Sequence, residues 1–136
     1  MGSGKTTIGK LLAEKLNVNF EDLDEMITVE YGLSINEIFS KYGETTFRSA
    51  ESNALISSTG NVISCGGGII LDKKNRDYIN NGLSFFLNVK LAELEKRLKH
   101  QNSRPLLDND NLKKTLNSIW EKREKIYLQT ANHSIT

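Results

Sequence analysis

The chain begins with a glycine-rich segment that leads directly into an amphipathic helix pattern. Its first residues match the second half of the phosphate-binding pattern G-x-x-x-x-G-K-[ST]. Small residues let backbone N–H groups close around phosphate oxygens, and the helix that follows adds its positive end. The alternative is a glycine-containing turn that caps an ordinary helix. The expected phosphate-binding residues are Gly2, Ser3, Gly4, Lys5, Thr6 and Thr7.

Two side chains of this segment have the chemistry that nucleotide phosphates require. Lys5 can reach the β- and γ-phosphates, and the hydroxyl of Thr6 can bind Mg²⁺, a hard cation that prefers oxygen ligands. The next residues support a helix, because four apolar side chains fall on one of its faces. They are Ile8, Leu11, Leu12 and Leu16.

Composition narrows the class of protein. A chain of 136 residues with 38% apolar content is enough for one folded domain. No apolar run is long enough for a membrane span and no signal peptide is recognisable, so we expect a cytoplasmic protein. Cys65 is the single cysteine, and we interpret it as a small core residue rather than a nucleophile.

Charge is balanced overall but unevenly distributed. The net charge of +1 argues against nucleic acid as the main partner. Residues 21–51 carry eight acidic and two basic side chains, whereas residues 90–125 carry ten basic and six acidic ones. This distribution would suit an anionic ligand held by the C-terminal half, although solvated helix faces explain most of it.

The order of expected elements predicts an α/β fold with a parallel sheet covered by helices on both faces. In such sheets, ligands bind at the carboxyl ends of the strands. Ser34 and Glu37 form a capping box that should open one of the helices. Beyond the first helix, we expect strands at 18–22, 61–65, 84–89 and 134–136, and helices at 25–30, 34–41, 44–57, 73–80, 91–99 and 111–129.

Chemically useful residues follow two of these strands. If the chain stays extended after the first strand, Asp22 and Asp24 point the same way, toward the phosphate-binding loop. One could hold a water of Mg²⁺ and the other could accept a proton from a substrate hydroxyl, although a solvated pair is the alternative. The next strand ends in three glycines, Gly66 to Gly68, which suggests that a group lies directly against the backbone.

Three arginines complete the candidate site. Arg48 by itself resembles an ordinary surface residue. Arg123 interrupts an apolar helical stripe, where its guanidinium must either pair with an anion or extend to the solvent. Arg104 lies in a polar stretch that contains a proline. We expect residues 98–111 to form a mobile lid that carries Arg104 onto phosphates, although an ordinary connecting loop would look similar.

In combination, these segments resemble shikimate kinases over essentially the whole chain. The resemblance depends on six short segments in this order: residues 2–7, 22–24, 44–48, 66–68, 104–107, and Arg123 with Tyr127. It implies an enzyme that transfers the γ-phosphoryl group of ATP to the 3-hydroxyl of shikimate. It also implies a Mg²⁺ cofactor, a monomer, and no nucleic-acid or membrane partner.

The resemblance implies a role for each matching residue. Lys5 and the loop amides would bind ATP phosphates, Thr6 would ligate Mg²⁺, and Asp22 would hold water of the metal. Asp24 would bind ring hydroxyls of the substrate and accept the proton. The shikimate carboxylate would be bound by Arg48, Arg123, Gly67 and Gly68. Arg104 would close over the transferred phosphoryl group, and Arg97 would pack against adenine.

The chain departs from the family pattern at a few places. The family usually has proline at the position of Lys125, and its pattern includes a strand before the loop and further elements after Thr136. We therefore expect residues 1–136 to be a single, incomplete kinase domain. Without the central strand, each buried unpaired backbone group would cost about 1–3 kcal/mol, so this chain should be unstable and poorly active.

The sequence is also compatible with two other functions. A gluconate or nucleoside monophosphate kinase would share Lys5 and Thr6 but would not need both Arg48 and Arg123 with the glycine triplet. A non-catalytic nucleotide-binding fragment would retain the loop without turnover.

Overall fold

The computed structural model describes residues 2–100 and 109–136. Its residues group into two compact units. One unit is Lys5–Asn75, and the other joins the residues before Lys5 to those from Arg76 onward. Each contains a pair of parallel strands and several helices, so the predicted α/β class is confirmed.

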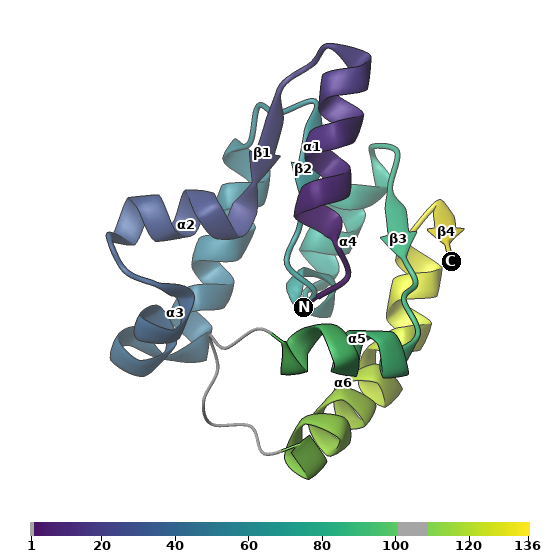
Figure 1. The fold of residues 1–136 in the computed structure, drawn as a ribbon. Coiled ribbons are helices and arrows are strands. Elements are labelled where there is room, and N and C mark those ends of the chain that lie inside the picture. Colours follow the sequence, from purple (N-terminus) through teal and green to yellow (C-terminus); the bar gives the residue numbers. More distant parts are fainter. Residues whose placement is uncertain (1, 101–108) are drawn as a thin grey trace. The chain divides into compact units, whose positions relative to one another are not determined.

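Strands β1 and β2 form the small parallel sheet of the unit Lys5–Asn75 (Figure 1). Helix α1 packs against both strands, and helices α2 and α3 make the connection between them. The register pairs Asp22 with Ser64, so both strands end at the same edge of the sheet. The elements are α1 Lys5–Leu16, β1 Phe20–Asp22, α2 Leu23–Tyr31, α3 Ile35–Ser57, β2 Val62–Ser64, and a short 3-10 helix, η1, Ile69–Leu71.

Helix α1 contacts the sheet through its smallest residues. Ala13 is buried, and a Cβ on Gly9 would lie 2.6 Å from Cε2 of Phe20, so the ring of β1 packs directly on the helix backbone. The apolar stripe noted in the sequence lies elsewhere on the helix and is exposed. Its members are Ile8, Leu11, Leu12 and Leu16, which are 47%, 54%, 38% and 58% exposed.

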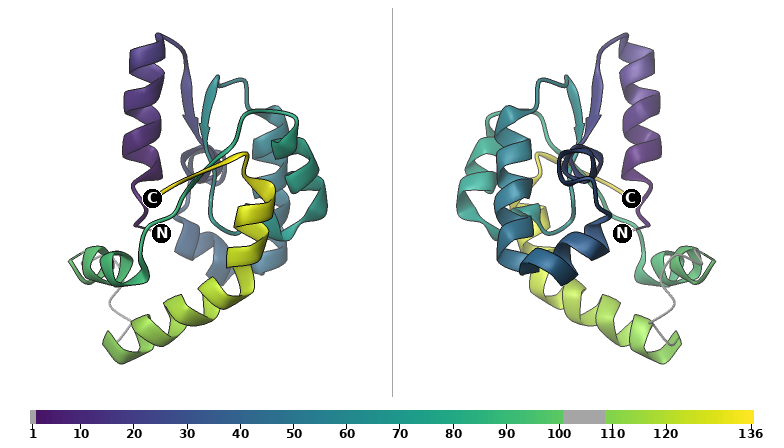
Figure 2. Two further views of the ribbon diagram at one scale, coloured as in Figure 1. Left: turned by 90° about the vertical axis from the view of Figure 1, so that its right-hand side faces the viewer. Right: turned by 90° about the vertical axis from the view of Figure 1, so that its left-hand side faces the viewer.

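Helix α3 joins two helices that the sequence predicted separately. The capping box is confirmed: Ser34 Oγ accepts from the Glu37 amide, and the Glu37 carboxylate accepts from the Ser34 amide. A sharp bend follows in the ribbon of α3 (Figure 2). It lies at Gly43, whose φ of 84° and ψ of 170° are not helical. The rings of Phe39 and Phe47 lie 4.6 Å apart across this bend, so apolar packing holds the two parts of α3 together.

The core of this unit lies mainly between α2 and α3. Leu23 and Ile27 of α2 and Ile38 of α3 are fully buried, and further apolar residues of α3 join them. Asn75, at the start of α4 (Lys73–Asn80), is also buried and donates to the carbonyl of Ile69 at 3.1 Å. This bond ties η1 to α4 and fixes the backbone that follows the glycine triplet.

The second unit has its own parallel pair of strands, β3 (Phe85–Leu87) and β4 (His133–Ile135). Helix α5 (Leu91–Lys99) follows β3, and α6 (Asn109–Thr130) leads into β4. The apolar stripe of α6 is confirmed in part, because Leu112 and Leu116 are buried. Tyr127 of the same helix stacks on the Phe86 ring at 4.8 Å.

The predicted ends of the helices and strands agree with the structure to different degrees. Helix α5 has the predicted bounds, while α6 extends two residues further at its N-terminus and one at its C-terminus than expected. All four strands occur; the first three are shorter than predicted, β4 has the predicted length but begins one residue earlier, and η1 was not predicted. Most of the expected lid, including Arg104, lies outside the described residues.

The loop between α3 and β2 is anchored by one carboxylate. Oε2 of Glu21, on β1, accepts hydrogen bonds from the Ser58 hydroxyl and from the amides of Thr59 and Gly60, at 3.0 and 2.9 Å for the amides. These bonds, led by the one from Ser58, lower the pKa of Glu21 below its ordinary value of 4.5. The anchored loop sets where β2 begins beside β1.

Replacing Glu21 by Gln should therefore destabilise the fold in a pH-dependent way. Because folding lowers the pKa of Glu21, its contribution is fully present above pH 4.5 and declines as the pH falls through the folded-state pKa. The free energy of unfolding at pH 7 should drop by up to about 1 kcal/mol for this partly exposed group. Urea denaturation at pH 7 and pH 3.5 measures the difference.

Glu14→Gln, at an exposed acid of α1, is the matched control and should change stability little at either pH. Equal losses for Glu21→Gln at both pH values would contradict the anchoring role of the ionised carboxylate.

Candidate functional site

The glycine-rich loop has the backbone that its sequence predicts. Gly2 and Gly4 adopt φ values of 69° and 84°, a left-handed region that favours glycine. Helix α1 begins immediately afterward, at Lys5. The first amides of a helix have no partners within it, so the start of α1 offers N–H groups and a positive end that suit an anion.

Asp22 connects the loop helix to the end of β1. Its Oδ2 accepts from the Thr6 hydroxyl at 2.7 Å, and its Oδ1 accepts from the amides of Asp24 and Glu25 at 3.0 and 3.4 Å. Burial alone would raise the pKa of Asp22, but the Thr6 bond and the charge of Lys5 outweigh it, and the pKa is lowered. Asp22 is therefore an ionised carboxylate that holds Thr6 in place.

The oxygens around Asp22 fit a hard divalent cation. Ser64 is paired with Asp22 in the sheet, and its buried hydroxyl is directed toward the Asp22 carboxylate, where it helps to lower the pKa of that acid. With Thr6, these groups provide hydroxyl and carboxylate oxygens, the ligand type that Mg²⁺ prefers. Among residues 2–100 and 109–136, no three His, Cys, Asp or Glu side chains form a metal cage. Mg²⁺ can bind without one, because it keeps several waters and uses substrate phosphates.

Asp24 reaches the same edge by a different route from the one predicted. The chain does not stay extended after β1, because Asp22 acts as the N-cap of α2 and Asp24 lies in the first helical turn. The carboxylate of Asp24 nevertheless lies 3.8 Å from Nζ of Lys5. The expected extended Asp-x-Asp geometry is therefore wrong, but both acids lie beside the start of α1.

Arg48 extends from α3 to the backbone that follows β2. Its guanidinium lies so close to Gly68 that a Cβ there would overlap it. Nη1 donates to the Glu51 carboxylate at 2.8 Å, and Nε lies at a looser 3.4 Å from the exposed carboxylate of Glu44. Arg48 thus has one firm, buried partner and one exposed partner that an incoming anion could replace.

Glu51 is the most deeply buried charged residue of this region, with 1% exposure. A Cβ on Gly66 would lie 2.7 Å from Oε2 of Glu51 and 3.2 Å from Oδ1 of Asp24. The absence of side chains at these glycines therefore admits charged groups, two carboxylates at Gly66 and the Arg48 guanidinium at Gly68. Sequence reasoning anticipated a close group at the glycines but did not identify Glu51, although its i,i+3 spacing from Arg48 was a usable signal.

The predicted site residues fall into two groups in the structure. Lys5, Thr6, Asp22, Asp24 and Arg48 belong to the unit Lys5–Asn75, together with the glycine triplet. The other group is in the second unit or outside the described residues. Arg123 is half-buried on α6, Arg97 donates to the Gly2 carbonyl at 3.0 Å, and Arg104 is among the residues not described. The roles expected for the residues of both groups stay predictions.

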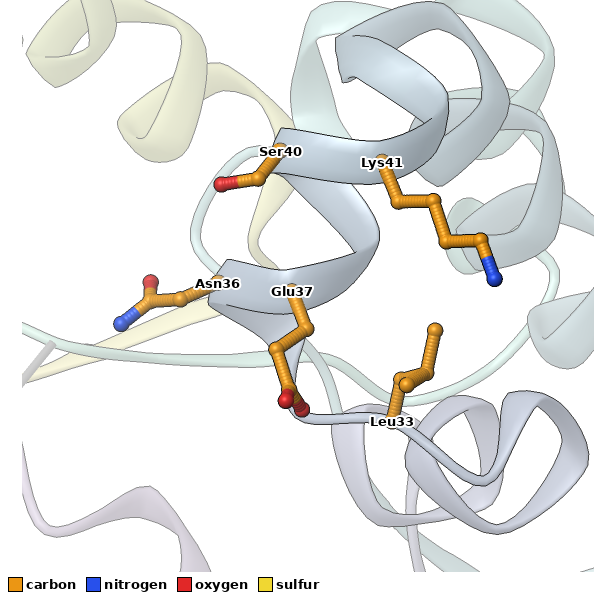
Figure 3. Close-up of a pocket in the computed structure, with 5 residues that line it drawn as sticks. All are labelled: Leu33, Asn36, Glu37, Ser40 and Lys41. Carbon is orange, nitrogen blue, oxygen red and sulfur yellow. The ribbon is translucent and has the colours of Figure 1, made fainter.

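An open depression of about 420 Å³ lies near the start of α3 (Figure 3). Asn36 and Ser40 extend to one side of the helix, and Lys41 extends to the other. Glu37 is already engaged in the capping box. None of the lining residues belongs to the site described above, and they offer no comparable cluster of opposite charges. These residues are Leu33, Asn36, Glu37, Ser40 and Lys41.

No described helix, within 2–100 or 109–136, combines the length and the apolar character that a membrane crossing requires.

Cys65 directly follows β2, and several charged side chains of the site act on its thiol. Burial, reinforced by the negative charge of Glu51, raises the pKa of its thiol to about 12, while Lys5 opposes the increase. The thiolate is the reactive form, so the folded chain should react with iodoacetamide at pH 8 far more slowly than the chain unfolded in urea. Mass spectrometry of the alkylated peptide measures both rates, and equal rates would contradict this environment.

The whole chain matches one protein family. The family described as Shikimate kinase covers residues 1–136. Shikimate kinase from Synechococcus elongatus is 43% identical over 132 residues, which span 95% of this chain and 70% of that protein. Shikimate kinase from Geobacter sulfurreducens is 41% identical over 131 residues, which span 93% of this chain and 72% of that protein.

Solved structures agree with these sequence relatives. Shikimate kinase from Acinetobacter baumannii, in complex with shikimate, superposes with a TM-score of 0.91 and 34% identity, over 100% of this chain and 78% of that one. Shikimate kinase from Bacteroides thetaiotaomicron gives a TM-score of 0.92 and 37% identity, over 100% of this chain and 81% of that one. The chain therefore belongs to the shikimate kinase family, as its short motifs predicted.

Proposed function

We propose that this chain transfers the γ-phosphoryl group of ATP to the 3-hydroxyl of shikimate. The observation that carries the proposal is the cluster at the start of α1, where Lys5, Asp24 and the Thr6–Asp22 pair meet within one compact unit. Phosphoryl transfer depends mainly on positioning and charge neutralisation, and this cluster supplies groups of both signs. Membership of the shikimate kinase family supports shikimate as the substrate.

The loop and Lys5 bind the phosphates of ATP. Amides of residues 2–7 and the Lys5 ammonium bind the β- and γ-phosphates. Thr6, and Asp22 through water, would hold Mg²⁺, and the buried Ser64 hydroxyl beside Asp22 adds a further oxygen to this edge of the sheet. When bound, Mg²⁺ neutralises charge on the phosphates.

Asp24 is the group that binds the attacking hydroxyl and accepts its proton. The hydroxyl oxygen forms a bond to the γ-phosphorus as the bond from that phosphorus to the β,γ-bridging oxygen breaks, and ADP leaves with the electron pair. The hydroxyl proton passes to the Asp24 carboxylate. Lys5, 3.8 Å from that carboxylate, keeps it beside the phosphate-binding loop.

The substrate carboxylate binds Arg48 against the glycine triplet. Glu51 holds one edge of the guanidinium, and the exposed Glu44 leaves the other edge when the substrate enters. Arg123 contributes a second guanidinium, and the backbone at Gly67 and Gly68 completes the pocket. A guanidinium is suited to this task because its planar fork matches a carboxylate.

The remaining proposals concern the closing of the lid, the adenine contact, and the location and partners of the protein. Arg104, on a lid formed by residues 98–111, closes over the transferred phosphoryl group, and Arg97 packs against adenine. The protein acts as a cytoplasmic monomer, and nucleic acid and membranes are not its partners.

A panel of acceptors tests the assignment. ADP release should be stimulated by shikimate with ATP and Mg²⁺, and not by gluconate or by nucleoside monophosphates. Formation of shikimate 3-phosphate, followed by mass spectrometry, identifies the product. Stimulation by a nucleoside monophosphate alone would overturn the proposal.

Replacing Asp24 by Asn should remove the proton acceptor while keeping the shape of the side chain. The expected loss is about 10² to 10³ in kcat, within the range for general-base catalysis. Glu25→Gln, at the adjacent exposed acid of α2, is the matched control and should retain turnover. Steady-state kinetics at saturating ATP compares the variants, and unchanged kcat in Asp24→Asn would show that Asp24 is not the base.

The two glutamates beside Arg48 provide a second matched pair. Glu51→Gln removes the buried charge that holds Nη1, and the KM for shikimate should rise about tenfold, the effect of losing about 1.4 kcal/mol. Glu44→Gln removes only the exposed, looser partner and should change that KM by less than about twofold. Equal effects of the two substitutions would contradict the division between a firm and a replaceable partner.

A further inference from the structure

One face of helix α5 lies directly against Gly2, at the beginning of the phosphate-binding loop. A Cβ built on Gly2 would lie 3.5 Å from Cγ of Leu98 and 3.7 Å from Cδ2 of Leu94, which is ordinary contact distance. Arg97 adds a hydrogen bond from Nη1 to the Gly2 carbonyl at 3.0 Å. These three residues are spaced i, i+3 and i+4, so they share one side of the helix.

The guanidinium of Arg97 is itself held in place. Its Nε donates to the Glu93 carboxylate, one helical turn earlier, at 2.8 Å. Because the guanidinium is planar and rigid, this bond fixes the direction in which Nη1 points. Glu93, Arg97 and the Gly2 carbonyl thus form a chain of two hydrogen bonds from α5 to the loop.

The bond to Gly2 determines the direction of the next amide. The described residues contain no cis peptide bond, so the Gly2–Ser3 peptide is trans. In a trans peptide, the carbonyl and the following N–H lie in one plane and point in opposite directions. While Arg97 holds the Gly2 carbonyl against α5, the Ser3 N–H must point away from α5.

We propose that Arg97, oriented by Glu93, is a positioning residue that presents the Ser3 amide to the nucleotide phosphates. The inference depends on the proposed kinase function, and it adds a role for Glu93 that the sequence did not indicate. It also gives Arg97 an effect on the loop in the absence of nucleotide. The in-plane edges of the guanidinium make these bonds, so its faces stay available for stacking.

Two measurements test the proposal with the same set of variants. The ¹⁵N order parameters of Ser3 and Gly4 are measured in the nucleotide-free chain, and the Kd for ADP is measured by calorimetry. The variants are Arg97→Ala, Glu93→Ala and the conservative Glu93→Gln. Glu95→Ala is the matched control, because it removes an equivalent i,i+4 ion pair, Glu95 with Lys99 at 2.7 Å, from the same helix.

Arg97→Ala should lower the Ser3 order parameter and raise the Kd for ADP by about threefold to tenfold, the effect of one charge-assisted hydrogen bond at an exposed site. Glu93→Ala should give a smaller change in the same direction, and Glu93→Gln should restore much of it because Gln can still accept from Nε. In steady-state kinetics, the KM for ATP should rise while the KM for shikimate stays constant. Glu95→Ala should match the unmodified chain.

The proposal is overturned if Arg97→Ala leaves the order parameters of Ser3 and Gly4 unchanged, since a role limited to direct nucleotide contact would give that result. It is also overturned if Glu95→Ala has the same effects, or if the loop loosens without any change in the Kd for ADP. Failure of the proposed function gives a different result. In that case the unmodified chain binds nucleotide without transferring phosphate to shikimate, while the variants still separate as described.

Discussion

The carboxylate of Asp22 is the point on which the arrangement of the site depends. It ends β1, caps α2 through the amides of Asp24 and Glu25, and accepts from Thr6 in the first turn of α1. A single buried side chain therefore fixes the start of two helices relative to one strand. Because the surrounding hydrogen bonds and Lys5 lower its pKa, Asp22 keeps its charge through the neutral range, and the contacts that require an ionised acceptor persist with it.

The sequence predicted elements best where local signals and periodicity agreed. Helix α5 has the expected bounds, and the capping box at Ser34 opens α3 as expected. The expected extended geometry of Asp22 and Asp24 was wrong because strand periodicity was extended past the end of β1. The acidic residues that follow Asp22 are equally typical of an N-cap and a first helical turn, and the structure follows that second pattern.

The sequence predicted the chemical types of the site residues better than the contacts between them. Lys5, Thr6, Asp22 and Asp24 could be assigned because each has a residue type that suits phosphate, metal or proton transfer. Glu51 could not be assigned in the same way, since its importance comes from burial beside Arg48, a contact that only the fold creates. The apolar stripe of α1 shows the same limit, because periodicity identified the helix but not the face that packs on the sheet.

The contacts of Gly66 and Gly68 restrict which sequences can encode this site. A missense change at either codon adds at least a Cβ, and that atom would meet Glu51 and Asp24 in one case and the guanidinium of Arg48 in the other. In both cases the end of a charged side chain would have to move, and the pairing of Arg48 with Glu51 would change with it. Changes in the shape of the acceptor pocket are therefore easier at residues whose side chains can be resized than at the two glycines that follow β2.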